Sequence, residues 1–168
     1  IGQGELEMTT LQMANLAATI ANRGHYYIPH LARAFDGDGS AIPDRFRKKN
    51  EIAIDRKHFE AVIEGMELAV RAGTAYNAYL PEVAICGKTG TSQNPHGEDH
   101  SVFFAFAPKV NPQIAIAVYV ENAGWGGEVA APIASLMIEK HLRGKVIRRD
   151  LHKRMIEKDL IGVKKNKT

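Results

Sequence analysis

The stretch Cys86-Gly87-Lys88-Thr89-Gly90-Thr91-Ser92 decides how the rest of this sequence is interpreted. It lies on a strand predicted from Val83 to Thr91. Side chains alternate between the two faces of a strand, so Thr89 and Thr91 share one side, and the glycines let other groups approach the backbone. Lys88 adds a fixed cation, and a strand edge can hold an extended peptide while a backbone N–H points at its carbonyl oxygen. The stretch therefore predicts a slot for a carboxylate.

Two more strands are predicted after it, Ser101 to Ala107 and Gln113 to Glu121. The segment 108–112 between them carries a proline at each end and is interpreted as a hairpin loop. In the last strand Ile and Val alternate with Ala and Tyr, so neither face is polar. This pattern predicts a sheet that is covered on both faces.

Helical periodicity predicts three main helices: Thr10 to Asn22, a helix capped by Asp55 that stops at Gly73, and Val129 to Leu142. Thr9 and Gln12 have the spacing of a capping box at the start of the first helix. The segment from Tyr26 to Phe35 is expected to be extended, and the polar stretch from Asp44 to Glu51 is interpreted as a loop. Helices and strands together indicate an α/β fold.

Composition narrows the class of protein. The chain has 168 residues, of which 45% are hydrophobic and 24% charged, enough to bury the core of one ordinary domain. No stretch approaches the roughly 20 consecutive apolar residues that span a bilayer. The single cysteine, Cys86, excludes a disulfide framework within the chain and a cysteine-rich zinc site.

The charge is unevenly distributed. Residues 143–168 hold ten Lys or Arg and three Asp or Glu, whereas residues 1–142 hold 12 and 16. A basic tail is compatible with nucleic acid, but this one is interrupted by acidic residues and has no aromatic side chain for base stacking. We therefore expect no nucleic-acid partner and a solvated tail that is partly helical or disordered, with Leu151 and Met155 on one side of a short helix.

Other candidate sites are weaker. His96, Asp99 and His100 have a spacing that zinc sites use, but they lie in a loop with Pro and Gly, where no helical face fixes them, so a solvated loop is favoured. Cys86 is expected to be a small buried residue rather than a nucleophile. Trp125, in the glycine-rich loop from Gly124 to Gly127, is expected to anchor that loop.

Several segments in order along the chain resemble class B penicillin-binding proteins. Lys-Thr-Gly is a known motif of penicillin-binding proteins and class A β-lactamases, although three residues alone recur by chance. The resemblance is closest to penicillin-binding protein 2, the elongation-specific branch, and covers about residues 1–142. The segments are Ile1-Gly2-Gln3-Gly4, Thr9-Thr10-Leu11-Gln12-Met13-Ala14, Gly73-Thr74-Ala75, Lys88-Thr89-Gly90-Thr91 and Ala105-Phe106-Ala107-Pro108.

The resemblance implies the penicillin-recognising serine transpeptidase and β-lactamase-like fold, an antiparallel sheet covered by helices on both faces. Residues 1–142 would be the C-terminal portion of a transpeptidase domain, and residues 143–168 a basic tail. The implied activity is that of a peptidoglycan D,D-transpeptidase, which cross-links stem peptides and binds β-lactams without a metal or organic cofactor. Implied partners are a SEDS-type glycosyltransferase and the elongation machinery, at the periplasmic face of the bacterial inner membrane.

The same resemblance implies roles for individual residues. Lys88 corresponds to the family lysine that supports the catalytic hydrogen-bond network and attracts the substrate carboxylate. Thr89 and Thr91 correspond to the hydroxyls that hold that carboxylate, and the backbone N–H of Thr91 corresponds to half of the oxyanion hole. Gly90 leaves room for substrate. The expected catalytic residues are thus Lys88 and Thr91, and the expected substrate-binding residues are Lys88, Thr89, Gly90 and Thr91.

One family motif is missing from this sequence. The nucleophile of the family lies in Ser-x-x-Lys, and no serine of this chain has Lys three residues later. Ser92-Gln93-Asn94 matches the family's Ser-x-Asn pattern, but it stands after Lys-Thr-Gly rather than before it, so we interpret it as coincidence. We expect the serine and the membrane anchor to lie upstream of Ile1, and the isolated chain to be inactive. The alternatives are a β-lactam sensor or β-lactamase, and an inactive interaction module.

A last expectation concerns the strand from Gln113 to Glu121. It lacks the Lys, Pro or bulge signals by which natural edge strands avoid association. In the family this strand pairs with one that precedes the serine, so here it is expected to be an unpaired edge. We expect the isolated chain either to self-associate through this strand or to be found packed against the missing part of its own domain. Its side chains Ile114, Ile116, Val118 and Val120 are expected to lose packing from the missing helices.

Overall fold

The computed structural model describes residues 4–31 and 42–160. The Ile1-Gly2-Gln3 part of the family-like opening, most of the second half of the predicted extended segment, and residues 161–168 of the tail lie outside the described residues. In chain order the elements are α1 (Thr10–Ala21), β1 (His25–Tyr26), α2 (Asp44–Arg47), β2 (Asn50–Glu51), α3 (Arg56–Ala72), the 3-10 turn η1 (Tyr76–Ala78), β3 (Cys86–Ser92), β4 (His100–Ala107), β5 (Ile114–Val120), α4 (Ala130–Arg143) and α5 (Arg149–Ile156).

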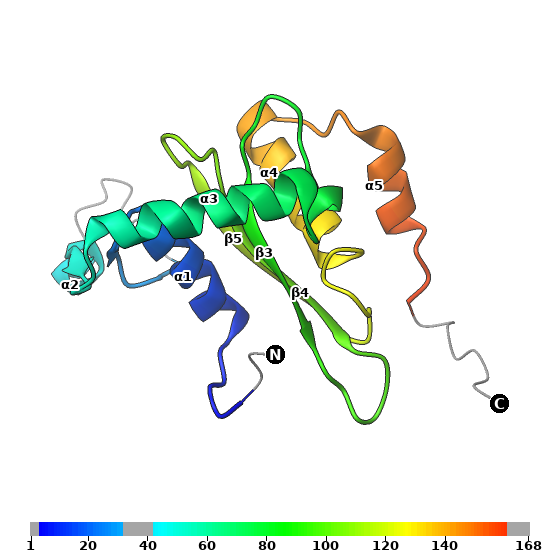
Figure 1. The fold of residues 1–168 in the computed structure, drawn as a ribbon, viewed down its shortest axis with the longest axis horizontal. Coiled ribbons are helices and arrows are strands. Elements are labelled where there is room, and N and C mark those ends of the chain that lie inside the picture. Colours follow the sequence, from blue (N-terminus) through cyan, green and yellow to red (C-terminus); the bar gives the residue numbers. More distant parts are fainter. Residues whose placement is uncertain (1–3, 32–41, 161–168) are drawn as a thin grey trace.

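The three predicted strands form one antiparallel sheet in the order β3-β4-β5 (Figure 1). Lys88 lies opposite Phe104, and β4 in turn pairs with β5 from Ser101 to Ala107. β3 begins at Cys86 rather than at Val83, because the backbone turns at Glu82 with φ 67° and Val83 pairs with Leu80 instead. The α/β class and the antiparallel sheet are confirmed.

Helices cover both faces of this sheet, as predicted. One face packs against α4 and η1, and the other packs against α1 and α3, which crosses in front of the sheet in Figure 1. The α4 side is rich in alanine, which allows the helix to lie close to the strands. The largest fully buried apolar side chains include Phe103 and Ile138 on the α4 side and Phe106 and Ile63 on the other.

Helix starts follow the predicted capping residues. Thr9 and Gln12 form the capping box, with Gln12 N donating to Thr9 Oγ1 at 3.2 Å and Thr9 N donating to Gln12 Oε1 at 2.7 Å. Asp55 accepts from the backbone N–H of Lys57 at 3.0 Å at the start of α3. The loop expected from Asp44 to Glu51 is wrong, because α2 lies there and β2 pairs with β1. That pairing joins segments distant in sequence, which local patterns do not reveal.

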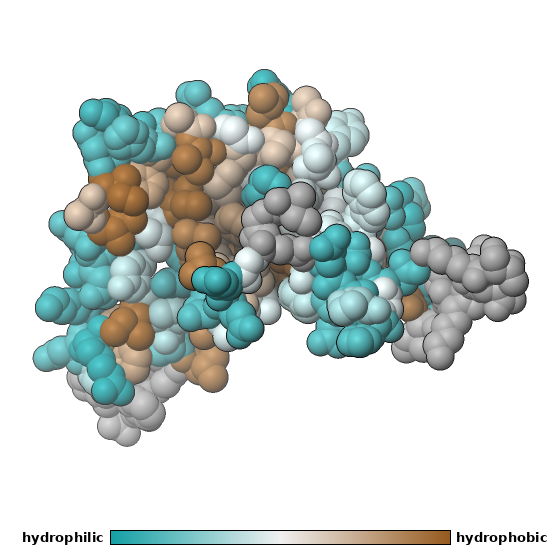
Figure 2. Space-filling model, turned by 60° about the horizontal axis from the view of Figure 1, so that its bottom comes forward, coloured by the Kyte–Doolittle hydropathy of each residue, from teal (hydrophilic) through white to brown (hydrophobic). Residues whose placement is uncertain are grey.

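The expectation that β5 loses its packing is wrong for three of its four Ile and Val side chains. Ile116 is buried and Ile114 and Val118 pack against the α4 cluster, so the helix that follows the strand covers them. Among the described residues, β5 pairs only with β4, which leaves its other edge without a strand partner. Apolar side chains of Met8 and Leu11 are also exposed near the start of α1, and Figure 2 shows apolar side chains gathered on part of the surface.

The tail is docked by a short helix. α4 ends at Gly144, which has φ 73°, and α5 then packs against α4. Leu151 and Met155 are half-buried while Ile156 is exposed, so the expected apolar side of this helix is present. In the described part of the chain, no helix combines the length and apolar character that crossing a membrane requires.

Candidate active site

β3 is an edge strand of the sheet formed by the described residues, with β4 on one side only. Thr89 lies opposite Phe103 and Thr91 opposite Ser101, so both threonines belong to the α4 side. Lys88 alternates to the other side, together with the buried Cys86. Since β3 is at an edge, side chains from both faces can reach the same rim.

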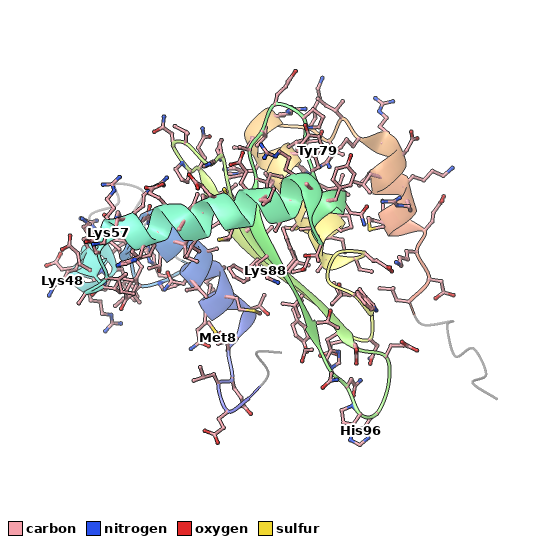
Figure 3. All side chains as sticks on the ribbon, viewed as in Figure 1. Met8, Lys48, Lys57, Tyr79, Lys88 and His96 are labelled. Carbon is pink, nitrogen blue, oxygen red and sulfur yellow. The ribbon has the colours of Figure 1, made fainter. Side chains whose placement is uncertain are left out.

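Lys88 carries the positive charge of this rim. Its side chain is exposed, and Nζ donates a hydrogen bond to the carbonyl oxygen of Thr89 at 2.7 Å. Figure 3 shows Lys88 on the sheet, well away from His96, which lies at the tip of the β3–β4 hairpin. The cation is thus held beside the strand that carries the two threonines.

Thr89 has a partner that was not predicted. Its hydroxyl lies 2.9 Å from the hydroxyl of Thr74, in the turn after α3. Two backbone hydrogen bonds hold this turn on the helix: Gly73 N and Ala75 N both donate to the carbonyl oxygen of Ala69, at 3.2 and 3.0 Å. Gly73-Thr74-Ala75 was recognised only as part of the family resemblance, and no spacing in the sequence places Thr74 beside Thr89.

Thr91 presents the second hydroxyl. Its side chain is exposed, and no group among the described residues hydrogen-bonds to that hydroxyl. Thr91 therefore has a hydroxyl available to a ligand, whereas the hydroxyl of Thr89 is shared with Thr74. Together with the Lys88 ammonium, these groups make a rim that suits a carboxylate.

The glycine-rich loop before α4 packs directly on this rim. A Cβ on Gly126 would overlap the carbonyl oxygens of Gly90 and Val102, and a Cβ on Gly127 would overlap the carbonyl oxygen of Thr74. A Cβ on Gly90 itself would meet only Val102 Cβ at 3.4 Å, an ordinary contact. Among the described residues, the loop can lie against the backbone at Gly90 because residue 126 is a glycine. A side chain at residue 90 itself would not prevent this approach.

Two side chains hold that loop in place. Asn77 Nδ2 donates to the carbonyl oxygen of Gly127 at 2.9 Å. The buried Ser101 donates to the carbonyl oxygen of Trp125 at 3.0 Å and accepts from Ala130 N at 3.0 Å. The indole of Trp125 is 73% exposed, so the prediction that this ring anchors the loop is wrong. The loop is instead held by the hydrogen bonds that the side chains of Asn77 and Ser101 make to its backbone, which the sequence did not indicate.

The other candidate groups lie outside this arrangement. Burial raises the pKa of the Cys86 thiol to about 12, with a smaller contribution from the charge of Glu67, so the thiol is protonated at neutral pH and is no nucleophile. Asp99 accepts from Asn94 N at 3.2 Å, and His100 Nδ1 accepts from Asn122 N at 3.0 Å. Within the described ranges, no three His, Cys, Asp or Glu side chains form a group that could hold a metal.

The serines of the described residues are Ser92, Ser101 and Ser135. Ser101 and Ser135 are buried and occupied by hydrogen bonds to backbone carbonyls, and Ser92 ends β3. Asn94, two residues later, donates to Asn122 at 2.7 Å within the hairpin loop. No serine among the described residues is therefore placed as a nucleophile beside Lys88, and Ser40 lies outside the described residues.

Comparison with known proteins identifies the family of this chain. The model of the penicillin binding protein transpeptidase domain matches residues 1–139. Peptidoglycan D,D-transpeptidase PbpA of Mycolicibacterium smegmatis is 34% identical over 154 residues, which cover 85% of this chain and 31% of that protein.

Solved structures lead to the same family. Pseudomonas aeruginosa PBP2 in complex with WCK 5153 aligns with a TM-score of 0.73 and 39% identity, over 89% of this chain and 33% of that one. The imipenem acyl-enzyme complex of M. tuberculosis penicillin-binding protein A aligns with a TM-score of 0.72 and 34% identity, over 84% and 32%. The chain spans about a third of the length of these relatives. With a family match over most of its residues and relatives above 30% identity, this chain belongs to the penicillin-binding protein transpeptidase family.

Proposed function

We propose that this chain is part of a peptidoglycan D,D-transpeptidase that cross-links stem peptides and is acylated by β-lactams. The observation that carries the proposal is the rim of β3, where an exposed Lys88 and the hydroxyls of Thr89 and Thr91 adjoin one strand edge. The names of the relatives support it, since they are a D,D-transpeptidase and penicillin-binding proteins, one of them an acyl-enzyme.

Each residue of the rim has a proposed role. The Lys88 ammonium attracts the carboxylate of the substrate, and the hydroxyls of Thr89 and Thr91 donate hydrogen bonds to it. The backbone N–H of Thr91 stabilises the oxyanion that forms at the attacked carbonyl, a contribution worth about 3 kcal/mol of barrier in other enzymes. Gly90 keeps the strand free of a side chain that would collide with an extended ligand.

The reaction needs a serine that is not among the residues of the rim. Its hydroxyl oxygen attacks the carbonyl carbon of the donor peptide, its proton passes to a base, and the C–N bond breaks to release the leaving amine and leave an ester. An amine of a second stem peptide then attacks that ester and regenerates the serine. A β-lactam enters the same first step, but its ring opens and the leaving amine stays attached.

The setting follows from the proposed reaction. Peptidoglycan is assembled outside the cytoplasmic membrane, so the proposed location is the periplasmic face of the inner membrane. The similarity to a penicillin-binding protein 2 supports a role in cell elongation, with a SEDS-type glycosyltransferase as partner. Lys88 and Thr91 are the proposed catalytic residues in this setting.

Labelling with a fluorescent penicillin tests the proposal. The complete protein that contains this sequence should form a covalent adduct, seen by gel fluorescence and as an added mass. The 168-residue chain should form none, because carboxylate recognition without a Ser-x-x-Lys serine leaves nothing to acylate. Labelling of the isolated chain, or no labelling of the complete protein, would contradict the proposal.

The same material separates the alternatives. A β-lactamase would lose the adduct within seconds to minutes and release hydrolysed penicillin, whereas a transpeptidase keeps it for much longer. A non-enzymatic interaction module would show no adduct in the complete protein even though the chain is folded. A lasting adduct together with release of D-alanine from a stem-peptide substrate supports the transpeptidase.

A further inference from the structure

A buried carboxylate lies on α4, outside the site described above. Glu139 is 0% exposed, and Arg148 Nε donates to its Oε2 at 3.1 Å. Arg143 Nη1 lies 3.7 Å from Oε1, which has no hydrogen-bond partner among the described residues. A buried carboxylate without a paired cation is strongly unfavourable, so Glu139 depends on these arginines. Both arginines follow the end of the family match at residue 139.

Arg148 does more than neutralise Glu139. Its Nη2 donates to the hydroxyl of the buried Ser135 at 3.1 Å, and its Nη1 donates to the carbonyl oxygen of Tyr79 at 2.9 Å. The planar guanidinium has donors in a fixed fork, and here each nitrogen has a different acceptor. Arg148 therefore links the segment after α4 both to α4 and to the end of η1.

Tyr79 belongs to the turn that carries Thr74. Tyr79 N donates to Tyr76 O at 2.9 Å, and Tyr76 N donates to Gly73 O at 3.1 Å. The rings of Tyr76 and Tyr79 stack, with centroids 5.9 Å apart and planes 4° apart. Since Thr74 stands between Gly73 and this pair, the carbonyl that Arg148 holds is at the far end of the turn that sets the position of Thr74.

The chain of contacts ends at β3. Thr74 shares its hydroxyl with Thr89 over 2.9 Å, and the carbonyl oxygen of Thr74 touches Gly127. Arg143 Nη2 donates to Pro81 O at 2.8 Å, which holds the exit of the same segment toward β3. Figure 3 labels Tyr79, near α4, and Lys88, on β3.

We propose that Arg148 is a positioning residue for the carboxylate-binding rim, acting on Thr89 through Tyr79 and Thr74. The inference rests on the proposed function, because Thr89 positions a ligand only if β3 binds one. The C-terminal segment is then more than a solvated tail, since it supplies the group that holds the Thr74 turn in place. A contiguous path alone does not establish such coupling, so the test measures coupling directly.

The first arm compares two variants of the complete protein. Glu139→Gln removes the buried charge but leaves the bond from Arg148 to Tyr79. Glu139→Gln/Arg148→Met removes that bond. Because residue 139 is then uncharged, the double variant does not bury a carboxylate that has lost its cation. We expect acylation by a penicillin, per folded molecule, to fall between about 10-fold and 100-fold from the first to the second variant. Arg149→Gln, which removes an exposed neighbouring guanidinium, should leave the rate unchanged.

The second arm is a double-mutant cycle with Thr89→Val. If Arg148 acts through Thr89, its loss should have little further effect in the Thr89→Val background, whereas independent effects would multiply. A purely structural role would lower thermal stability and leave the acylation rate of folded protein unchanged. The inference would be overturned if the effects of losing Arg148 and Thr89 on the acylation rate multiply. It would also be overturned if Glu139→Gln and Glu139→Gln/Arg148→Met are acylated at equal rates.

A third arm does not depend on acylation. Amide hydrogen exchange of residues 73–79 and 89–91 is measured in the 168-residue chain for the same pair of variants, and faster exchange is expected in Glu139→Gln/Arg148→Met. Unchanged exchange would overturn the inference even if the rates differ. Failure of the parent protein to label with penicillin would instead refute the proposed function, and the exchange data would still decide whether Arg148 holds the turn.

Discussion

The two outer strands of the three-stranded sheet have opposite surface chemistry. β3 presents Lys88 and Thr91 as exposed polar side chains, with Gly90 between them, while β5 is a run of Ile, Ala, Val and Tyr. Both strands are backed by helices, β3 by α3 and β5 by α1 and α4, so support does not distinguish them. The edge proposed to bind a ligand, β3, is polar, whereas β5 lacks the charges and prolines by which natural edge strands avoid association.

The difference between the two edges predicts ligand recognition at β3 and self-association at β5. A polar edge with a cation and two hydroxyls selects ligands by charge and hydrogen bonding, and main-chain pairing adds affinity. An apolar edge has no such selectivity and gains mainly from burial. Four changes test this division, taken from the largest expected effect to the smallest.

Removing the polar groups of β3 should abolish most of its chemistry. In the complete protein, Lys88→Ala and Thr91→Val should each slow acylation by a fluorescent penicillin by about 100-fold to 1000-fold, because each removes a group aimed at developing or bound negative charge. Both side chains are exposed, so the melting temperature should change little. Lys140→Ala, which removes an exposed lysine of α4, is the matched control. Unchanged rates in both rim variants would contradict the assignment.

Replacing each of the two glycines of β3 by alanine should change the free energy of unfolding by different amounts. A Cβ on Gly87 would overlap the ring of the buried Phe103, whereas a Cβ on Gly90 makes only an ordinary contact with Val102. Gly87→Ala should therefore cost about 1–3 kcal/mol in the free energy of unfolding, and Gly90→Ala close to none. Urea unfolding of the 168-residue chain measures both. Equal effects at the two positions would show that Phe103 moves aside readily.

A charge on β5 should weaken self-association of the isolated chain. Tyr119 is 38% exposed on this strand, and lysine is a residue that natural edge strands use against pairing. We expect the 168-residue chain to associate by light scattering, and Tyr119→Lys to weaken that association roughly tenfold, equal to about 1.4 kcal/mol. Val110→Lys, in the exposed loop between β4 and β5, should have no effect. A monomeric parent chain would refute the apolar edge as an association site.

Because the thiol of Cys86 in β3 is buried, the free energy of unfolding should fall at alkaline pH. Burial raises the pKa of Cys86 to about 12, so above pH 9 the unfolded chain loses a thiol proton that the folded chain keeps. Stability is then full below the unfolded pKa and falls as pH rises toward 12, by about 1 kcal/mol between pH 9 and 10. Unfolding free energies at both pH values should show this slope in the parent chain and a smaller one in Cys86→Ala. Identical slopes would count against the raised pKa.

Much of the fold could be predicted because its signals are local. The capping residues Thr9 and Asp55, the apolar stripe of α3 and the alternation in β5 each lie within one element. The segment Asp44 to Glu51 was missed because β2 forms only by pairing with β1, across residues that are distant in sequence. Local polarity suggested a loop, and tertiary pairing decided otherwise.

The candidate site also has a part that local sequence patterns predict and a part that depends on contacts between elements. Lys88, Thr89 and Thr91 could be proposed from sequence because they form the Lys-Thr-Gly motif and its continuation, and strand alternation states which side each residue takes. Thr74, Gly126 and Arg148 could not, since each acts through a contact with a residue of another element. Gly126 in particular must be a glycine because a Cβ there would overlap the carbonyl oxygens of Gly90 and Val102. No sequence pattern near residue 126 indicates this requirement.

The buried Glu139 also sets an order of events during synthesis. A ribosome releases this carboxylate nine residues before Arg148, so for an interval α4 is complete but its buried charge lacks its hydrogen-bonding cation. Docking the helix then would bury a carboxylate without that cation, at a cost of several kcal/mol. The alanine-rich face of α4 should therefore close over the sheet only after the segment to Arg148 has emerged. A nascent chain stopped between residues 144 and 147 would keep that face open to chaperones and proteases.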